Sequence, residues 1–159
     1  MSHGHFEEYA VIDTPGVYGI SSFNDEEKVA RDVILTADLI VNVVDAVHLE
    51  RDLFLSLQVI ETGIPTIIVL NMMDDAKREG LKIDLALLEE QLGVPVIPAV
   101  AIKGKGLKEL KEKLREARTG NIPLERQAQL KALTCRNYCR QSEALLILEG
   151  DEIVAKRIG

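Results

Sequence analysis

Short apolar runs alternate with longer amphipathic stretches between residue 9 and about residue 114. The short runs are rich in Val and Ile, and together with the longer stretches they are typical of strands and helices in a parallel α/β sheet. Four strands with helices between them indicate a doubly wound sheet. The pattern predicts strands at 9–13, 38–46, 65–71 and 94–100, and helices at 24–37, 49–63, 84–93 and 106–118.

Residues that favour helix ends support these boundaries. Asn24 or Asp25 is a good cap for the first helix, and Gly63 is a typical residue for the end of the second. The pattern changes after residue 118, where Gly120 and Pro123 break the last helix of the sheet region. Residues 119–159 then read as two or three helices broken near Gln141 and Gly150, which predicts a small C-terminal helical appendage.

Composition narrows the classes of partner. A chain of 159 residues fits one domain with a small appendage, and 47% hydrophobic and 28% charged residues are those of an ordinary globular protein. Only 4% of residues are aromatic and the net charge is −7, so nucleic acid is not an expected partner. A free nucleotide can still bind such a chain through local backbone donors and a metal ion.

The two cysteines do not indicate a metal site or a disulfide. Cys135 and Cys139 would share one face of a helix, and the three histidines lie far away in the sequence. We interpret both residues as reduced, partly buried thiols of a cytosolic protein. No apolar run approaches the roughly 20 residues that a bilayer crossing requires.

The stretch VIDTPG is the first candidate for chemistry. Asp13 ends a predicted strand, where ligands of open α/β sheets gather, and a carboxylate there can hold magnesium through water. Gly16 has no side chain, so its amide can approach a terminal phosphate closely. Asp-Thr-Pro-Gly is also ordinary turn chemistry, and the motif alone favours neither interpretation.

The stretch IIVLNMMD is the second candidate. Asn71 ends an apolar strand, and the carboxylate of Asp74 could accept hydrogen bonds from both donors on the pairing edge of guanine. Adenine offers no such pair of donors, so the arrangement would discriminate strongly between the bases. A strand end followed by a helix cap is the alternative, and the motif in isolation favours that alternative.

A third loop follows the next predicted strand. Parallel strands end at one edge of a sheet, so the loops after residues 13, 71 and 100 should lie together. Backbone amides of Ala101 and Ile102 could then meet the guanine carbonyl, with Lys103 beside the base. The basic residues at 105–113 are more simply a solvated helix.

In this order, DTPG, NMMD and AVAIKG resemble the later signature motifs of a guanine-nucleotide-binding domain. The text at 43–74 and 92–111 is similar to the cytosolic G domain of the ferrous iron transport protein B (FeoB) family, and the resemblance extends from about Tyr9 to the end. It implies a P-loop-NTPase-like (GTPase) fold over residues 1–118. Residues 119–159 resemble the family's helical domain, which resembles a nucleotide-dissociation inhibitor and stabilises the bound nucleotide.

The resemblance also implies roles for single residues. Asp13 would be the magnesium-side aspartate and Gly16 the γ-phosphate sensor, with residues 17–27 as the second switch. The expected nucleotide-binding residues on the base side are Asn71, Met72, Asp74, Ala101, Ile102 and Lys103, and Met73 also flanks the base. Ala101 departs from the family, which often has Ser or Thr there, and this should weaken base binding only moderately. No catalytic residue is assigned.

The 159 residues contain no Gly-x-x-x-x-Gly-Lys followed by Ser or Thr, and no first switch. The chain is therefore expected to be N-terminally truncated and unable to hydrolyse GTP efficiently, because no nest of amides surrounds the β-phosphate. In the resembling family, the first strand of the domain lies in the middle of the sheet, between the strands at 9–13 and 38–46, and it is missing here. Its loss should leave open sheet edges, which would be closed by re-pairing of strands or by self-association.

Two functions follow from these expectations. The first is the GTP- or GDP-binding, magnesium-dependent regulatory part of a ferrous iron membrane transporter, on the cytosolic side and with the membrane domain as its partner. The alternative is a non-catalytic remnant that acts as a protein-interaction module. A ribosome-assembly GTPase would need a basic RNA-binding extension, which is not found here.

Overall fold

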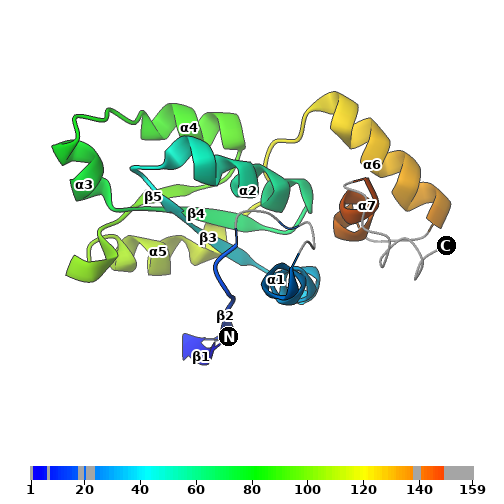
Figure 1. Ribbon diagram of the computed structural model, residues 1–159, viewed down its shortest axis with the longest axis horizontal. Coiled ribbons are helices and arrows are strands. Elements are labelled where there is room, and N and C mark those ends of the chain that lie inside the picture. Colours follow the sequence, from blue (N-terminus) through cyan, green and yellow to red (C-terminus); the bar gives the residue numbers. More distant parts are fainter. Residues whose placement is uncertain (1, 7, 18–19, 21–23, 138–140, 149–159) are drawn as a thin grey trace.

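The computed structural model describes residues 2–6, 8–17, 20, 24–137 and 141–148 (Figure 1). Within these residues the strands are β1 Ser2–Phe6, β2 Tyr9–Asp13, β3 Ile40–Asp45, β4 Thr66–Asn71 and β5 Val96–Pro98. The helices are α1 Asp25–Thr36, α2 Leu49–Glu61, α3 Met73–Arg78, α4 Leu85–Leu92, α5 Leu107–Lys113, α6 Leu124–Asn137 and α7 Gln141–Leu148. Two 3-10 turns, η1 Ala101–Lys103 and η2 Leu114–Glu116, flank α5.

The centre of the fold is a parallel sheet in the order β3-β4-β5. Figure 1 shows α2 and α4 on one face of this sheet and α5 on the other. Ile68 and Leu70 of β4 pack with α2 and α4, whereas Ile67 packs with Leu114 and Leu110 on the α5 side. All three β4 residues are fully buried, because a strand with helices on both faces has no solvent-facing side. The predicted α/β fold class is confirmed.

Helix ends follow the predicted residues closely. Asn24 caps α1, and its side-chain oxygen accepts a hydrogen bond of 2.8 Å from the amide of Glu27. This bond satisfies one of the donors that the first helical turn leaves without a partner. Gly63 follows α2 with φ of +75°, a left-handed conformation that glycine adopts without steric cost.

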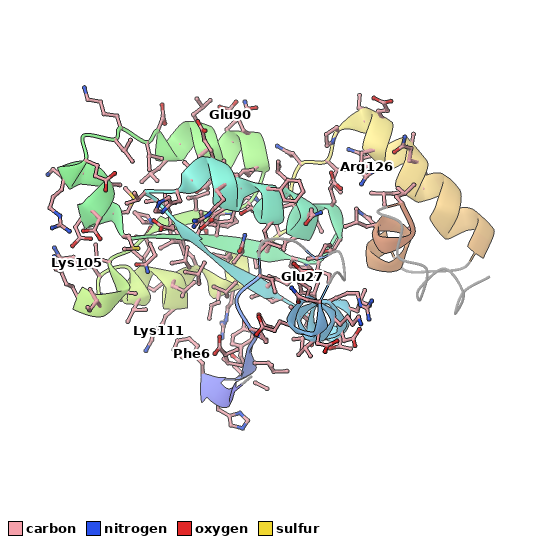
Figure 2. The ribbon with its side chains drawn as sticks, viewed as in Figure 1. Phe6, Glu27, Glu90, Lys105, Lys111 and Arg126 are labelled. Carbon is pink, nitrogen blue, oxygen red and sulfur yellow. The ribbon has the colours of Figure 1, made fainter. Side chains whose placement is uncertain are left out.

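The prediction that residues 9–13 join the parallel sheet is wrong. The strand β2 pairs antiparallel with β1, from Phe6 opposite Tyr9 to Ser2 opposite Asp13. Only residues 7 and 8 separate the two strands, so this pairing closes a very short loop at low entropic cost. The hairpin attaches to α5, where the ammonium of Lys111 lies 4.7 Å from the centre of the Phe6 ring (Figure 2).

The strand β3 is covered on one face and open on the other. It lies at an edge of the sheet, and its residues Val41 and Val43 have 39% and 62% of their surface exposed. Asn42 and Val44 point to the other face, where α2 buries them. Open sheet edges were the expected consequence of a missing neighbouring strand, and the described residues show one at β3.

The two described helices of the C-terminal segment pack together at the end of α2. Leu130 of α6 and Ala144 and Leu145 of α7 are buried against Val59 and the isolated residue Ile20. The helix α7 begins at the predicted break, Gln141, whereas Gly150 lies outside the described residues. Cys139 also lies outside them, and Cys135 belongs to α6. Among the described helices, none is long and apolar enough to cross a bilayer.

Candidate nucleotide-base site

Two neighbouring strands bring the base-side residues together. Leu70 of β4 lies opposite Pro98 of β5, so the loops that follow these strands leave the sheet at the same edge. Asn71 is the last residue of β4, and the turn η1 begins at Ala101. The amide of Met73 donates a hydrogen bond of 3.2 Å to the carbonyl of Ala99, which joins the two loops directly.

Asn71 ties the edge of the sheet together. Its side-chain oxygen accepts a hydrogen bond of 2.9 Å from the amide of Ala101, thirty residues along the chain. Its backbone carbonyl accepts one of 2.9 Å from the amide of Ala46, which follows β3. The residue therefore holds the ends of three strands in a common arrangement, a role that the sequence did not predict.

The turn after Asn71 is strained at Met72. Met72 has φ of +61°, and among the described residues it is the one non-glycine residue in the left-handed region. A side chain in that region costs about 1–2 kcal/mol, so the surrounding contacts must hold it there. Its side chain is 39% exposed at this edge, which agrees with a surface on which a flat ring could lie.

Asp74 lies in the first turn of α3 with about a third of its side chain exposed. Its Oδ1 accepts a hydrogen bond of 3.1 Å from the amide of Asp75, and its Oδ2 accepts one of 2.6 Å from the ammonium of Lys103. The bond from Lys103 holds the pKa of Asp74 below its ordinary value, although partial burial opposes this. The carboxylate is therefore ionised at neutral pH and can accept hydrogen bonds.

The turn η1 presents backbone and side-chain groups beside Asp74. The amide of Ala101 donates to the side chain of Asn71. The amide of Lys103 donates to the carbonyl of Val100 at 2.9 Å. Ile102, between them, has 93% of its surface exposed. Figure 2 shows Lys105, two residues after the end of η1, at the end of the molecule where Figure 1 labels α3. An ionised carboxylate facing an exposed turn can bind a ligand with adjacent donors and an acceptor.

Asp13 and Gly16 lie elsewhere. Asp13 is exposed at the end of the β1–β2 hairpin, so the expectation that all three loops emerge from one sheet is wrong for this residue. Gly16 lines a hollow of about 210 Å³ with Asn42, Val43 and the first turns of α2. The described residues form no cluster of three or more metal-binding side chains. A magnesium ion at Asp13 would therefore need phosphate and water among its ligands.

The carboxyl end of β3 holds an acidic residue that was not among the predicted site residues. Asp45 lies opposite Asn71 in the sheet, and it binds the amide of Val47 and the ring Nδ1 of His48, each at 2.8 Å. Burial raises the pKa of Asp45, but the bonds from His48 and Val47 outweigh this and lower it overall. The sequence contained a signal for Asp45, because this residue ends an apolar strand just as Asn71 does.

Comparison with known proteins places these features in a family context. A family model described as ferrous iron transport protein B matches residues 1–114. The Fe(2+) transporter FeoB of Salmonella typhimurium is 40% identical over 129 residues, which are 77% of this chain and 17% of the relative. The chain therefore spans about a sixth of the length of that relative.

Solved structures extend the similarity to the C-terminal helices. The cytosolic domain of L. pneumophila FeoB has a TM-score of 0.81 and 30% identity, over 98% of this chain and 68% of its own. A point mutant of S. thermophilus NFeoB bound to GMPPNP has a TM-score of 0.84 and 34% identity, over 99% and 69%. That protein has the same fold as this chain, and its structure was solved with the guanine nucleotide analogue bound.

Proposed function

This chain belongs to the ferrous iron transport protein B (FeoB) family, and on that premise we propose that it forms the guanine-nucleotide-binding part of a ferrous iron transporter. The observation that carries the proposal is the joined pair of loops after β4 and β5. Asn71 fixes the turn η1, and Asp74 faces that turn with an ionised carboxylate. The remainder of the transporter, including its membrane domain, is the proposed partner, and the cytosolic side of the membrane is the proposed location.

The two loops suggest how guanine would be held. The carboxylate of Asp74 would accept hydrogen bonds from the ring N–H and the exocyclic amine, which adenine cannot supply together. We expect the amide of Ile102 to meet the guanine carbonyl, since those of Ala101 and Lys103 donate within the protein. Met72, held in a strained turn, would lie against a face of the ring.

The phosphate side is less complete in these residues. We propose that Gly16 contacts the terminal phosphate and that Asp13 helps to hold magnesium, which are the roles that the family resemblance implies. The 159 residues contain no phosphate-loop sequence, so we expect them to bind GDP mainly through the base and not to hydrolyse GTP by themselves. When magnesium is bound, it would offset phosphate charge.

The helical segment, proposed as residues 119–159, lies far from the base site. Figure 1 shows α6 and α7 at the end of the molecule opposite α3. Arg126 pairs with Glu61 at 3.2 Å, and Gln141 donates to the carbonyl of Glu61 at 3.1 Å, so α6 and α7 contact the last turn of α2. Asn121, before α6, donates to the carbonyls of Leu92 and Glu90 at the end of α4. We expect any effect of this segment on nucleotide binding to pass through α2 and α4, which it contacts directly.

The open edge of β3 favours a second candidate function. Val41 and Val43 expose apolar surface beside the edge at which β3 has no partner strand among the described residues, and another chain could add a strand there. We propose self-association of two copies of this chain as that function. Sedimentation of the wild type and of a Val43→Lys variant tests it, because a dimer at micromolar concentration that the lysine abolishes would support it. A monomer at every concentration would contradict it.

Calorimetric titration with GDP tests the nucleotide proposal. We expect measurable affinity for GDP, little for ADP, and a loss of at least about tenfold in Asp74→Ala, because both charged hydrogen bonds to the base disappear. Asp75→Ala is the matched control, since Asp75 carries the same charge one residue along and pairs with Arg78. Equal loss in the two variants, or equal affinity for GDP and ADP, would contradict the proposal.

A further inference from the structure

We propose that Lys103 competes with the guanine base for the carboxylate of Asp74 and thereby lowers the affinity of the site for guanine. The inference deepens the proposed function and rests on it, because it concerns the same site. Lys103 was expected only to lie beside the base. In the structure its ammonium instead lies 2.6 Å from Oδ2 of Asp74, on the group that would recognise guanine.

Both oxygens of Asp74 have partners within the protein. Oδ1 accepts the amide hydrogen of Asp75, and Oδ2 accepts the ammonium of Lys103. The first bond is local to the first turn of α3 and takes one of the two acceptor sites of Oδ1, so a ligand can use the other. The second bond joins two loops that lie 29 residues apart in sequence. Because it comes from an exposed side chain and not from helix backbone, it is the bond of the two that a ligand would disturb.

The geometry of guanine directs one donor at each oxygen of Asp74. Its N1–H and its exocyclic amine are adjacent, parallel donors, and they take one lone pair from each carboxylate oxygen at the same time. The lysine ammonium at 2.6 Å from Oδ2 takes one of the two acceptor sites of that oxygen, so a donor of guanine competes with it there. A base with only the N1–H donor, such as hypoxanthine, can bind one oxygen and leave the ion pair in place.

Lys103 is able to leave. More than half of its side chain is exposed, so water can take over the ammonium when the bond breaks. Exposed ion pairs shift equilibria by no more than about fivefold, so competition would weaken guanine binding without preventing it. Arg78 also lies near enough to lower the pKa of Asp74, but its guanidinium pairs with Asp75. Lys103 is thus the cation that directly contacts the recognition group.

The experiment uses nucleosides, because they are uncharged and report on the base site alone. Guanosine and inosine are titrated into the full chain, followed by amide chemical shifts, for wild type, Lys103→Met and Lys105→Met. We expect Lys103→Met to bind guanosine about two- to fivefold more tightly and inosine with unchanged affinity. Lys105→Met removes the same charge two residues along and should match the wild type.

Salt provides a second readout. Salt screens an exposed ion pair but has little effect on a neutral ligand, so wild-type affinity for guanosine should rise between low and high salt. The affinity of Lys103→Met should stay constant over the same range. A role of Lys103 in folding alone would not produce this difference.

The outcomes separate the two proposals. If wild type binds guanosine and Asp74→Ala does not, the base site stands. In that case unchanged or weaker binding by Lys103→Met overturns only the competition, and weaker binding would mean that Lys103 supports the base. If wild type fails to bind guanosine, or binds it equally well without Asp74, the proposed function fails and the competition fails with it.

Discussion

A buried hydrogen bond between β3 and α2 offers a quantitative test of how the sheet edge is held. The side-chain amide of Asn42 donates to the hydroxyl oxygen of Ser56 at 2.6 Å. Asn42 is 8% exposed and Ser56 is fully buried, so water has little access to this bond. Ser56 also donates to the carbonyl of Asp52 at 3.2 Å, in the preceding turn of α2.

Ser56→Ala should destabilise the protein by about 1–3 kcal/mol. The substitution preserves size but leaves the buried amide of Asn42 without its acceptor, and the cost is the desolvation of that group. Replacing both partners, as in Asn42→Val with Ser56→Ala, leaves no orphaned group. We therefore expect the double variant to lie within about 1 kcal/mol of the wild type and above the single variant in stability.

Urea unfolding followed by circular dichroism measures these differences, provided that the slope with denaturant stays constant. Thr36→Val is the control, because the hydroxyl of Thr36 donates to the carbonyl of Val33 at an exposed position. We expect that control to change stability by less than about 0.5 kcal/mol. A cost below about 0.5 kcal/mol for Ser56→Ala would refute the reasoning, since Asn42 would then be hydrated from the hollow that it lines.

Two further predictions concern the site itself. The lowered pKa of Asp45 contributes stability that is present above the unfolded pKa of 3.8 and is lost as pH falls through the folded pKa. In urea titrations the stability difference between wild type and Asp45→Asn should therefore shrink from pH 7 to pH 3. A constant difference would contradict this. Gly106→Ala should destabilise the protein more than Gly104→Ala and should weaken guanosine binding. Both glycines have positive φ, but a Cβ at Gly106 would lie 2.6 Å from the carbonyl oxygen of Pro98, whereas a Cβ at Gly104 would meet no atom within 4 Å. Equal unfolding midpoints for the two glycine variants would show that the crowding is relieved.

The sequence predicted the parts of the fold that depend on local pattern. The strand β4 and the cap at Asn24 follow from an apolar run and from a short polar side chain beside acidic residues. The hairpin could not be found in this way, because Ser2–Phe6 lacks a strand-like alternation and pairs only through the partner that lies next to it. The exposure of Val43 likewise depends on which strand lies beside β3, which no local pattern encodes.

The site was predicted as a set of residues, but their contacts were not predicted. Asn71 and Asp74 were identified because Asn71 ends a buried strand and Asp74 follows it three residues later. That Asn71 holds the amide of Ala101, and that Lys103 reaches Asp74, depends on how two loops about thirty residues apart fold against each other. Asp13 was assigned to the wrong sheet for the same reason, since pairing between distant strands decides its position.

The base-side half of the site depends on few parts of the chain. Its contacts run between β4, β5, α3 and η1, with one hydrogen bond from Ala46, which follows β3. The elements β4, β5 and α3 share a core that Leu70, Val96 and Ala76 help to form on one face of the sheet. None of those contacts involves the hairpin or the exposed edge of β3, where the described structure departs most from the expected sheet. Guanine recognition should therefore be separable from phosphate binding. Affinity for guanosine should respond to Asn71 and Asp74 and be insensitive to changes at Asp13.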